Sequence, residues 1–210
     1  MTDKAPLAGN IRVTRQDWLN VAMDTLMSDG IEQVKILNLA ERLSVSRSSF
    51  YWYFKSRQDL LDALMNQWLE TNTKALVDAA ARPAGSVAEA VCNIFEGFVD
   101  PAQFSNALDF AIRDWARRSV RVRKVLDTSD AQRVDAFAAM FARFGYDEID
   151  SLTRARVLYY MQIGYNDADL REPPETRIAL VPHYIKVFTG QAAPETVMQA
   201  FNAKMAQLLR

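Results

Sequence analysis

The sequence predicts an all-α protein with a short N-terminal helical domain and a longer C-terminal helical domain. Every long segment of the 210 residues places apolar side chains at helical spacing, and the alternation typical of strands is absent. Capping and helix-ending residues separate these segments. Half of the residues are apolar, which is enough to form one large core or two small ones. The chain is therefore expected to be globular.

Capping residues define the helices of the first part. Thr14 and Ser56 each open a Ser/Thr-x-x-acid capping box, in which a hydroxyl and a carboxylate each bond a backbone N–H group. Ser46 is placed to cap a short helix, and Gly30 is placed to end the first one. The predicted elements are a helix over about 14–30, a short helix around 39–43, a second short helix from 47, and a long helix over 57–82.

Similar signals divide the rest of the chain. Ser86 and Asp147 are expected N-caps, Gly145 is expected to end a long helix, and Pro194 suits a first helical position. The predicted helices span about 86–99, 104–119, 120–144, 147–170 and 173–190, with a last one from 194. Helices before residue 56 are short, whereas those after it are long and rich in aromatic residues. We therefore predict domains at 1–56 and 57–210, joined by the helix over 57–82.

Composition narrows the possible functions. With one cysteine, Cys92, the chain cannot form an internal disulfide, and we expect a buried thiol in a reducing compartment. No apolar run approaches the roughly 20 residues that span a bilayer, and the first residues lack the apolar segment of a signal peptide. A cytoplasmic protein without a membrane partner is predicted. One histidine and one cysteine, with no Gly-rich phosphate loop, argue against a metal site, a cofactor or an enzyme.

Residues 39–60 carry the most informative pattern. They predict two short helices joined by a tight turn, an arrangement that reads the DNA major groove. Phe50 and Phe54 lie one turn apart and are expected to be buried. The opposite face would then present side chains able to contact base edges or thymine methyl groups. These side chains are Arg47, Ser48, Ser49, Tyr51 and Trp52. Tyr53 and Lys55 are placed to contact phosphates, which fix register but carry no sequence information.

The same region resembles the TetR family of one-component transcriptional regulators. The resemblance covers about residues 12–62, and beyond them only the all-helical pattern agrees. It rests on three segments, Asp29-Gly30, Leu39-Ala-Glu-Arg-Leu-Ser-Val-Ser46 and Phe50-Tyr-Trp-Tyr-Phe-Lys-Ser-Arg-Gln-Asp-Leu-Leu61. The family implies a homodimer with an N-terminal three-helix helix-turn-helix DNA-binding domain and a C-terminal helical ligand-binding and dimerisation domain. By position, the resemblance assigns base contacts to Arg47, Ser48, Ser49, Tyr51 and Trp52, and phosphate contacts to Thr14, Lys35, Tyr53, Lys55 and Arg57.

Two residues depart from the family pattern. Ser44 stands in the turn where the family usually has glycine. We therefore expect it to adopt a backbone conformation that costs about 1 kcal/mol for any residue other than glycine. Lys35 stands near the position where the family tends to have a hydroxyl N-cap. Its presence removes a contribution of about 1 kcal/mol to the stability of the helix. The fold is expected to survive both changes.

The C-terminal part is expected to hold an effector pocket, since ligand pockets are lined by aromatic side chains with a few polar groups. The predicted pocket residues are Asn72, Phe95, Phe98, Phe110, Arg113, Phe141, Tyr160, Gln162 and Asn166. We expect an apolar or aromatic effector, with a carboxylate if Arg113 faces it. Alternatively, the aromatic residues fill a core, and Arg113 belongs to a solvated basic stripe with Arg117, Arg121 and Lys124.

Two apolar stripes are candidates for a dimer interface. Leu152, Ala155, Tyr159 and Ile163 form one stripe, and Ile178, Val181, Ile185 and Phe188 form the other. Two such helices from each chain would make a four-helix bundle with twofold symmetry. Packing within one chain is the alternative.

Taken together, these patterns favour a ligand-responsive repressor that binds a palindromic double-stranded DNA operator and leaves it when a small-molecule effector binds. The alternatives are a transcriptional activator with the same DNA-binding domain, a helical protein–protein interaction module, and an all-helical enzyme. An enzyme would have to rely on carboxylates such as Asp109 and Asp114.

Overall fold

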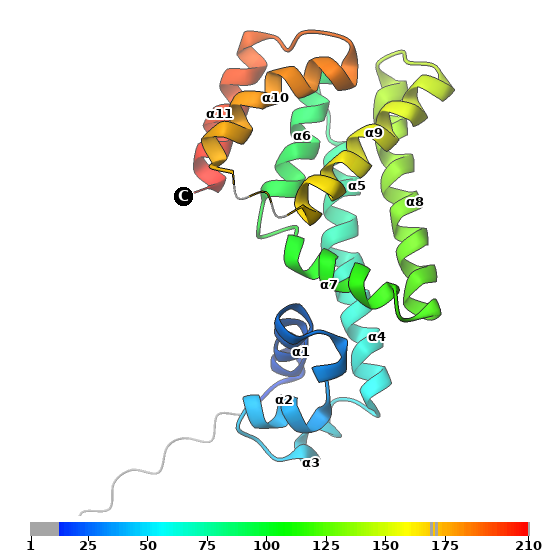
Figure 1. Ribbon diagram of the computed structural model, residues 1–210, viewed down its shortest axis with the longest axis vertical. Coiled ribbons are helices and arrows are strands. Elements are labelled where there is room, and N and C mark those ends of the chain that lie inside the picture. The colour runs from blue at the N-terminus through cyan, green and yellow to red at the C-terminus, as the bar shows by residue number, and fades with distance from the viewer. Residues whose placement is uncertain (1–12, 169, 171, 210) are drawn as a thin grey trace, which may run out of the picture. The chain divides into compact units, whose positions relative to one another are not determined.

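The computed structural model describes residues 13–168, 170 and 172–209, and within these ranges every regular element is helical (Figure 1). The chain divides into two compact units between Met65 and Asn66. The division falls inside the helix that joins the units, whereas the sequence predicted it at the turn before that helix. The all-α fold class is as predicted.

The N-terminal unit contains α1 (Arg15–Asp29), the short 3₁₀ turn η1 (Ile31–Gln33), α2 (Ile36–Arg42), α3 (Arg47–Phe50) and the start of α4 (Arg57–Trp68). The predicted capping box opens α1. The Asp17 amide donates to Thr14 Oγ1 (3.2 Å), and the Thr14 amide donates to the Asp17 carboxylate (2.7 Å). Gly30 ends the helix with a φ of 80°, a backbone conformation that residues with a Cβ rarely adopt.

Aromatic side chains hold α3 against the other helices of this unit. Trp18, Leu39 and Phe50 are fully buried, and Phe54 is nearly so. The ring of Phe50 meets Trp18 edge-on at 5.2 Å and stacks on Phe54 at 5.4 Å. Both rings are buried as the helical spacing predicted, and they fix which face of α3 is turned outward.

The long helix expected over 57–82 is interrupted. A five-residue π-helical segment, η2 (Leu69–Thr73), follows α4, and α5 (Lys74–Ala81) continues from it. Asn72 and Thr73 are neighbours in this segment, yet both side chains are buried and hydrogen-bonded. Such π segments occur often at functional sites. The apolar periodicity did not indicate this interruption.

Six further helices follow α5 in the described part of the C-terminal unit. They are α6 (Val87–Val99), α7 (Asn106–Ala116), α8 (Val120–Arg143), α9 (Glu148–Asp167), α10 (Pro174–Thr189) and α11 (Glu195–Leu208). Side chains of Ser86, Ser105, Ser119 and Asp147 each accept a bond from a backbone amide in the first turn of the helix that follows. Gly190 ends α10 in the left-handed conformation.

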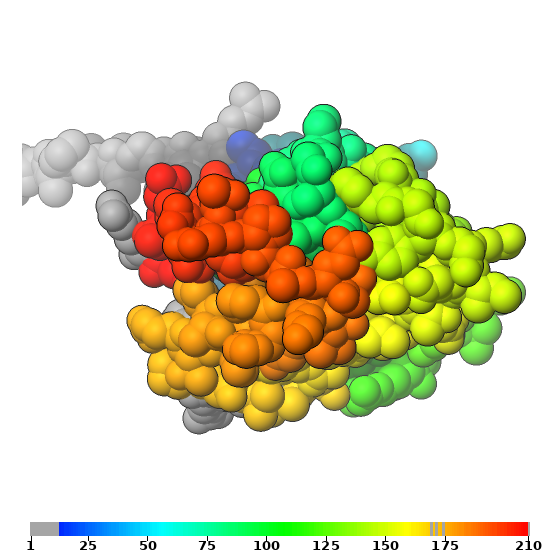
Figure 2. Space-filling model, turned by 90° about the horizontal axis from the view of Figure 1, so that it is seen from above, coloured from blue at the N-terminus to red at the C-terminus, as the bar shows by residue number. Residues whose placement is uncertain are grey.

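Helix α6 lies at the centre of this unit. It packs against α5, α10 and α11, while α8 packs against α5, α7 and α9. Figure 2 shows a face of the unit that is formed by α11, α10, α6 and α9. Gly97 of α6 allows a close approach to α5, because a Cβ atom on it would lie 2.9 Å from the Cβ of Ala79.

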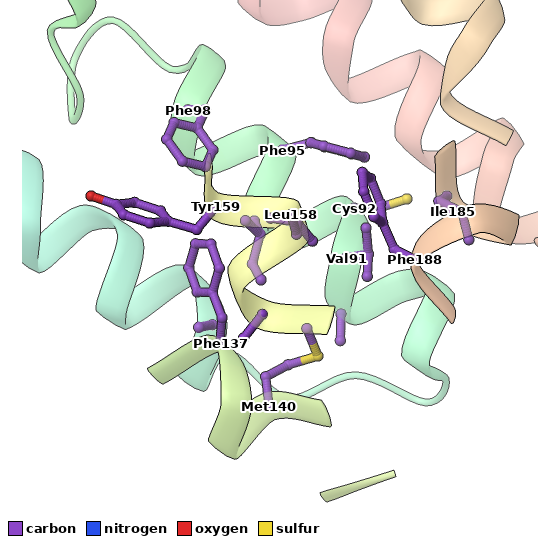
Figure 3. Close-up of a cluster of buried hydrophobic side chains, with 14 of the residues drawn as sticks. Val91, Cys92, Phe95, Phe98, Phe137, Met140, Leu158, Tyr159, Ile185 and Phe188 are labelled. Atoms are coloured by element: carbon purple, nitrogen blue, oxygen red, sulfur yellow. The ribbon is translucent and has the colours of Figure 1, made fainter. Parts of the chain in front are cut away.

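The core of the unit is a single apolar cluster contributed mainly by α6, α8, α9 and α10 (Figure 3). Phe137 lies near the ring of Tyr159, edge-on at 5.9 Å. The hydroxyl of Tyr159 points away from the labelled apolar side chains in Figure 3. Cys92 is 3% exposed, which agrees with the prediction of a buried thiol. Within the described ranges, no helix has the length and apolar character needed to cross a membrane.

Candidate functional site

The outward face of α3 and of the turn that follows it carries the side chains predicted to read bases. Arg47 and Ser48 are exposed, Ser49 is half-buried, and the rings of Tyr51 and Trp52 are 59% and 79% exposed. Tyr51 and Trp52 are neighbours, so they expose their rings together on one surface. With Phe50 anchored beneath them, these side chains form one surface around a rigid, short helix.

Two of the hydroxyls on this surface already make internal hydrogen bonds. The Ser49 hydroxyl donates to the backbone carbonyl of Ser46 (2.7 Å), and the Ser48 hydroxyl pairs with that of Ser46 (2.8 Å). Ser46 is the N-cap of α3 as predicted, but its side chain does not bond a backbone amide of the helix. Arg47, Tyr51 and Trp52 therefore offer the freest contacts on this face.

The turn between α2 and α3 has the geometry expected from the departure at Ser44. Ser44 has a φ of 55°, the left-handed conformation that favours glycine. The amide of Val45 donates to the carbonyl of Ala40 (3.0 Å), which closes the end of α2. Lys35 occupies the N-cap of α2 without a side-chain cap bond, also as expected, and its side chain is exposed.

Three side chains predicted to contact phosphates use donors within the chain instead. Tyr53 donates its hydroxyl to the carbonyl of Val13 (2.7 Å), and Thr14 donates its hydroxyl to Asp17 (2.7 Å). Arg57 donates to the carbonyls of Val34 (2.5 Å) and Ile31 (2.9 Å). These hydrogen bonds hold the N-terminal unit together. Thr14, Lys35 and Lys55 are exposed, whereas Tyr53 and Arg57 are half-buried. The hydrogen bond from Thr14 also lowers the pKa of the Asp17 carboxyl.

A cavity of about 260 Å³ lies in the C-terminal unit between α6, α9, α10 and α11, at the start of α7. Its lining is mostly aromatic and aliphatic, with a group of polar side chains. The lining residues are Phe95, Phe98, Val99, Asn106, Met161, Gln162, Tyr165, Asn166, Glu172, Arg177, Ile178, Val181, Tyr184, Phe201, Met205 and Leu209.

Four of the predicted pocket residues line this cavity, namely Phe95, Phe98, Gln162 and Asn166. The other five do not. Phe141 belongs to the apolar core, Tyr160 is 45% exposed, and Phe110 is absent from the lining. Asn72 and Arg113 make hydrogen bonds elsewhere in the unit. Aromatic content alone could not separate cavity from core, because both are lined by the same residue types.

The polar side chains of the cavity form a chain of amides. Gln162 Nε2 donates to Asn166 Oδ1 (3.2 Å), and Asn166 Nδ2 donates to Asn106 Oδ1 (2.6 Å). Beside them, the Tyr165 hydroxyl donates to the Glu172 carboxylate, and the Arg177 guanidinium lies 4.5 Å from the centre of the Tyr165 ring. Among the described residues, these two bonds leave the Gln162 carbonyl oxygen and the Asn106 side-chain nitrogen able to make further hydrogen bonds.

Arg113 belongs to a buried ionic cluster rather than to a pocket or a solvated stripe. Its guanidinium bonds both oxygens of Asp130 (2.8 and 3.0 Å) and Asp109 Oδ2 (3.0 Å). Arg133 is fully buried and bonds Asp109 Oδ1 (3.0 Å), while the hydroxyl of Tyr159 accepts from both arginines. The sequence already indicated that Arg133 is buried, because Arg133 lies four residues before Phe137 on the apolar face of α8.

The two arginines control the ionisation of this cluster. Burial alone would raise the pKa of Asp109, but the charges of Arg133 and Arg113 outweigh burial and hold the pKa below its usual range. Burial raises the pKa of the Tyr159 hydroxyl. The cluster reaches the π segment, since Arg133 Nη2 donates to Thr73 Oγ1 (3.0 Å) and Trp68 Nε1 donates to Asp109 (3.0 Å).

The cavity is also linked to the π segment through Asn72. The side-chain amide of Asn72 donates to the Ser105 carbonyl (2.8 Å), and its oxygen accepts from the Ser105 amide (3.2 Å). Ser105 is the N-cap of α7, and the next residue, Asn106, lines the cavity. A short covalent and hydrogen-bonded route therefore runs from the cavity to the helix that begins at Arg57.

The predicted dimer stripes lie mostly inside the chain. Ala155, Tyr159, Val181, Ile185 and Phe188 are buried in the core, and Ile178 lines the cavity with Val181. For these buried residues the predicted interface is wrong, because α9 and α10 carry apolar side chains on two faces and the predicted stripes lie mainly on the inward face. Leu152 is 42% exposed and Ile163 is half-buried. The outer face carries Ile149, Val157 and Tyr160 on α9, with Leu180 and Val187 on α10.

Comparison with known proteins identifies the N-terminal unit. Residues 19–64 match the family model of bacterial regulatory proteins of the tetR family. The class C tetracycline repressor protein of Escherichia coli is 36% identical over 61 residues, which are 29% of this chain and 28% of that protein. The class A repressor from transposon 1721 is 37% identical over 54 residues, covering 26% and 25% of the two chains. The similarity thus spans little more than a quarter of the curated relatives.

The fold extends this similarity over the whole chain. Mycobacterium smegmatis AmtR superimposes with a TM-score of 0.62 and 16% identity, covering 98% of both chains. The ketosteroid transcriptional regulator KstR2 of Mycobacterium tuberculosis has a TM-score of 0.61 and 17% identity over 90% of this chain and all of that one. Among the described residues, no three His, Cys, Asp or Glu side chains form a metal-binding group. Residues 19–64 thus match the tetR family model, and the whole chain shares the fold of these solved transcriptional regulators.

Proposed function

We propose that this protein is a sequence-specific DNA-binding repressor that leaves a palindromic operator when a small, largely apolar effector binds. The observation that carries the proposal is the surface of α3, where Arg47, Tyr51 and Trp52 are exposed above the buried Phe50. Arginine can bond guanine O6 and N7, and aromatic rings can pack on thymine methyl groups. Lys35 and Lys55 would contact the phosphates that fix the register.

A second copy of the chain would pack against the outer face of α9 and α10. This face exposes several apolar side chains, of which Ile149 is 80% and Val187 is 70% exposed. In an isologous dimer the same surface patch of each copy packs against the other, so one interface covers this apolar face on both copies. Twofold symmetry would set two α3 helices to read two half-sites about one helical turn of DNA apart.

The effector would act from the cavity through Ser105 and Asn72. A ligand that contacts Asn106 would bear on the first turn of α7, and Asn72 would transmit a shift there to η2 and α4. Since α4 begins in the N-terminal unit, a change in its direction would move α3 relative to the operator. An effector that binds the non-DNA state more tightly would then shift the population toward it.

The first test is retardation of the DNA upstream of the protein's own gene at low salt. We expect a discrete, salt-sensitive complex, because phosphate contacts release counterions. No retardation at low salt would overturn the proposal and favour a helical protein–protein interaction module.

The dimer is tested separately with Val187→Glu and a matched control, Val120→Glu, which alters a valine that is 76% exposed on α8. Light scattering after size exclusion should report a monomer for Val187→Glu and a dimer for the control. Val187→Glu should also lose tight operator binding. A dimeric Val187→Glu protein would contradict the assignment of this face.

A further inference from the structure

We propose that the cavity binds a neutral ring compound of about ten non-hydrogen atoms that carries a single hydroxyl or carbonyl group. The proposal rests on the proposed function for its regulatory meaning, while the binding itself can be measured without DNA. Four properties of the cavity support it: its volume, its apolar walls, its amide chain and the charge balance at its polar end.

The volume sets the size of the ligand. An apolar cavity of about 150 Å³ holds one benzene molecule. By proportion, the cavity of about 260 Å³ holds about ten non-hydrogen atoms. Two fused six-membered rings match this size, whereas a four-ring compound does not.

The walls favour a ring over a flexible chain. Phe95, Phe98 and Phe201 are nearly fully buried and line the cavity with Tyr184. Aromatic side chains make offset or edge-on contacts with a flat ligand. Met205 completes this lining with a polarisable thioether that adapts to the outline of a ring.

The amide chain provides the site for the polar group of the ligand. Gln162 is 7% exposed, and the only hydrogen bond of its side chain among the described residues is the one it donates to Asn166. Its carbonyl oxygen is therefore available as an acceptor for a ligand in the cavity. A ligand hydroxyl can donate to it, and a ligand carbonyl can accept its second N–H bond. Removing such a group from water without a partner is unfavourable, so the amide favours a ligand that supplies one.

The charges at the polar end select a neutral ligand. Glu172 and Arg177 both line the cavity, so their opposite charges balance. Tyr165 holds the Glu172 carboxylate by its hydroxyl and offers its ring to Arg177. A carboxylate ligand at Arg177 would approach Glu172 as a like charge and lose hydration as it entered.

Three probes with the same ring system separate these contributions. Naphthalene has no polar group, 2-naphthol has a neutral hydroxyl, and 2-naphthoate has a carboxylate. Isothermal titration calorimetry with the full-length protein at neutral pH gives the three affinities. We expect 2-naphthol to bind about 3- to 10-fold more tightly than naphthalene, the gain of one net hydrogen bond. We expect 2-naphthoate to bind more weakly than 2-naphthol.

Variants assign the effect to the cavity. Gln162→Met keeps the side-chain length and removes the amide, so the preference for 2-naphthol over naphthalene should fall to about one. Gln132→Met alters an exposed glutamine of α8 and should keep the wild-type preference. Ile178→Trp fills part of the cavity from a half-buried position and should weaken all three probes.

Tighter binding of 2-naphthoate than of 2-naphthol, an unchanged preference in Gln162→Met, or no binding of any probe would each overturn the proposal. Its failure is distinguishable from failure of the regulatory function. Operator DNA that is retarded while no probe binds would leave the regulator standing and reject this ligand class. A preference for 2-naphthol without DNA retardation would support this ligand class and reject the regulatory function.

Discussion

Asn72 holds the backbone of Ser105 by both ends of its side-chain amide, at 2.8 and 3.2 Å. Asn72 is 1% exposed and lies in the π segment between α4 and α5. Ser105 lies next to Asn106, which lines the cavity. One side chain thus joins the edge of the cavity to the helix that enters the N-terminal unit.

Replacing Asn72 by Leu should destabilise the C-terminal unit by about 1–3 kcal/mol, because the two hydrogen bonds between the buried Asn72 side chain and the Ser105 backbone are lost, although the Ser105 carbonyl keeps the bond that it accepts from the Asp109 amide. Chemical denaturation measures this change. Thr71→Ala, which alters the exposed neighbour of Asn72, is the control and should change stability by less than about 1 kcal/mol. In hydrogen exchange, Asn72→Leu should also lose protection at the first turn of α7. Unchanged protection there would argue against the link.

The buried cluster predicts a specific acid sensitivity. The pKa of Asp109 is lowered in the folded protein, so its ionised form stabilises the fold above the unfolded pKa of about 4. That contribution should be lost as pH falls from about 4 toward the lower folded pKa. Denaturation midpoints measured between pH 7 and 3 should show this decline in the wild type.

Asp109→Asn should remove that decline and lower stability at neutral pH. The variant leaves the fully buried Arg133 without its ion-pair partner, which costs about 3–5 kcal/mol. Asp114→Asn, on the same helix with a partly exposed side chain, is the control and should stay close to wild type at every pH. A neutral-pH stability of Asp109→Asn equal to that of the control would contradict the account of the cluster.

The turn between α2 and α3 predicts a stabilising substitution. Ser44 has a φ of 55°, a conformation that costs about 1 kcal/mol or more for a residue with a Cβ. Ser44→Gly should relieve this cost and raise the melting temperature. The gain in stability is reduced by the greater conformational entropy that glycine gives the unfolded chain. Ser44→Ala should not raise it, since alanine keeps the Cβ. Equal melting temperatures for Gly and Ala variants would show that the turn carries no such strain.

Local rules predicted most of the N-terminal unit correctly. The spacing of Phe50 and Phe54 indicated burial, and both rings are buried. The capping box at Thr14 formed, and Ser44 adopted the conformation expected of it. These features depend on neighbours in sequence, so periodicity and turn chemistry are sufficient to predict them.

The cavity and the outer helix faces depend on long-range packing and were predicted only in part. Helix α9 has apolar side chains on two faces, and periodicity could not tell that Tyr159 points inward while Ile149 is exposed. Arg113 looked like part of a solvated stripe, but α8 brings Asp130 to it from a distant part of the sequence. The π segment also follows from tertiary contacts of Asn72 and Thr73 rather than from local propensity.

The most direct test of the central claim compares Arg47→Ala with Lys55→Ala on an operator fragment and on unrelated DNA of the same length. Arg47 is assigned to bases and Lys55 to phosphates. Arg47→Ala should therefore reduce the ratio of specific to non-specific affinity by about 5- to 150-fold, the value of 1–3 kcal/mol for a good base contact. Lys55→Ala should weaken both affinities about equally and lower the salt slope by about one. Equal losses of specific and non-specific affinity in both variants would contradict sequence reading by α3.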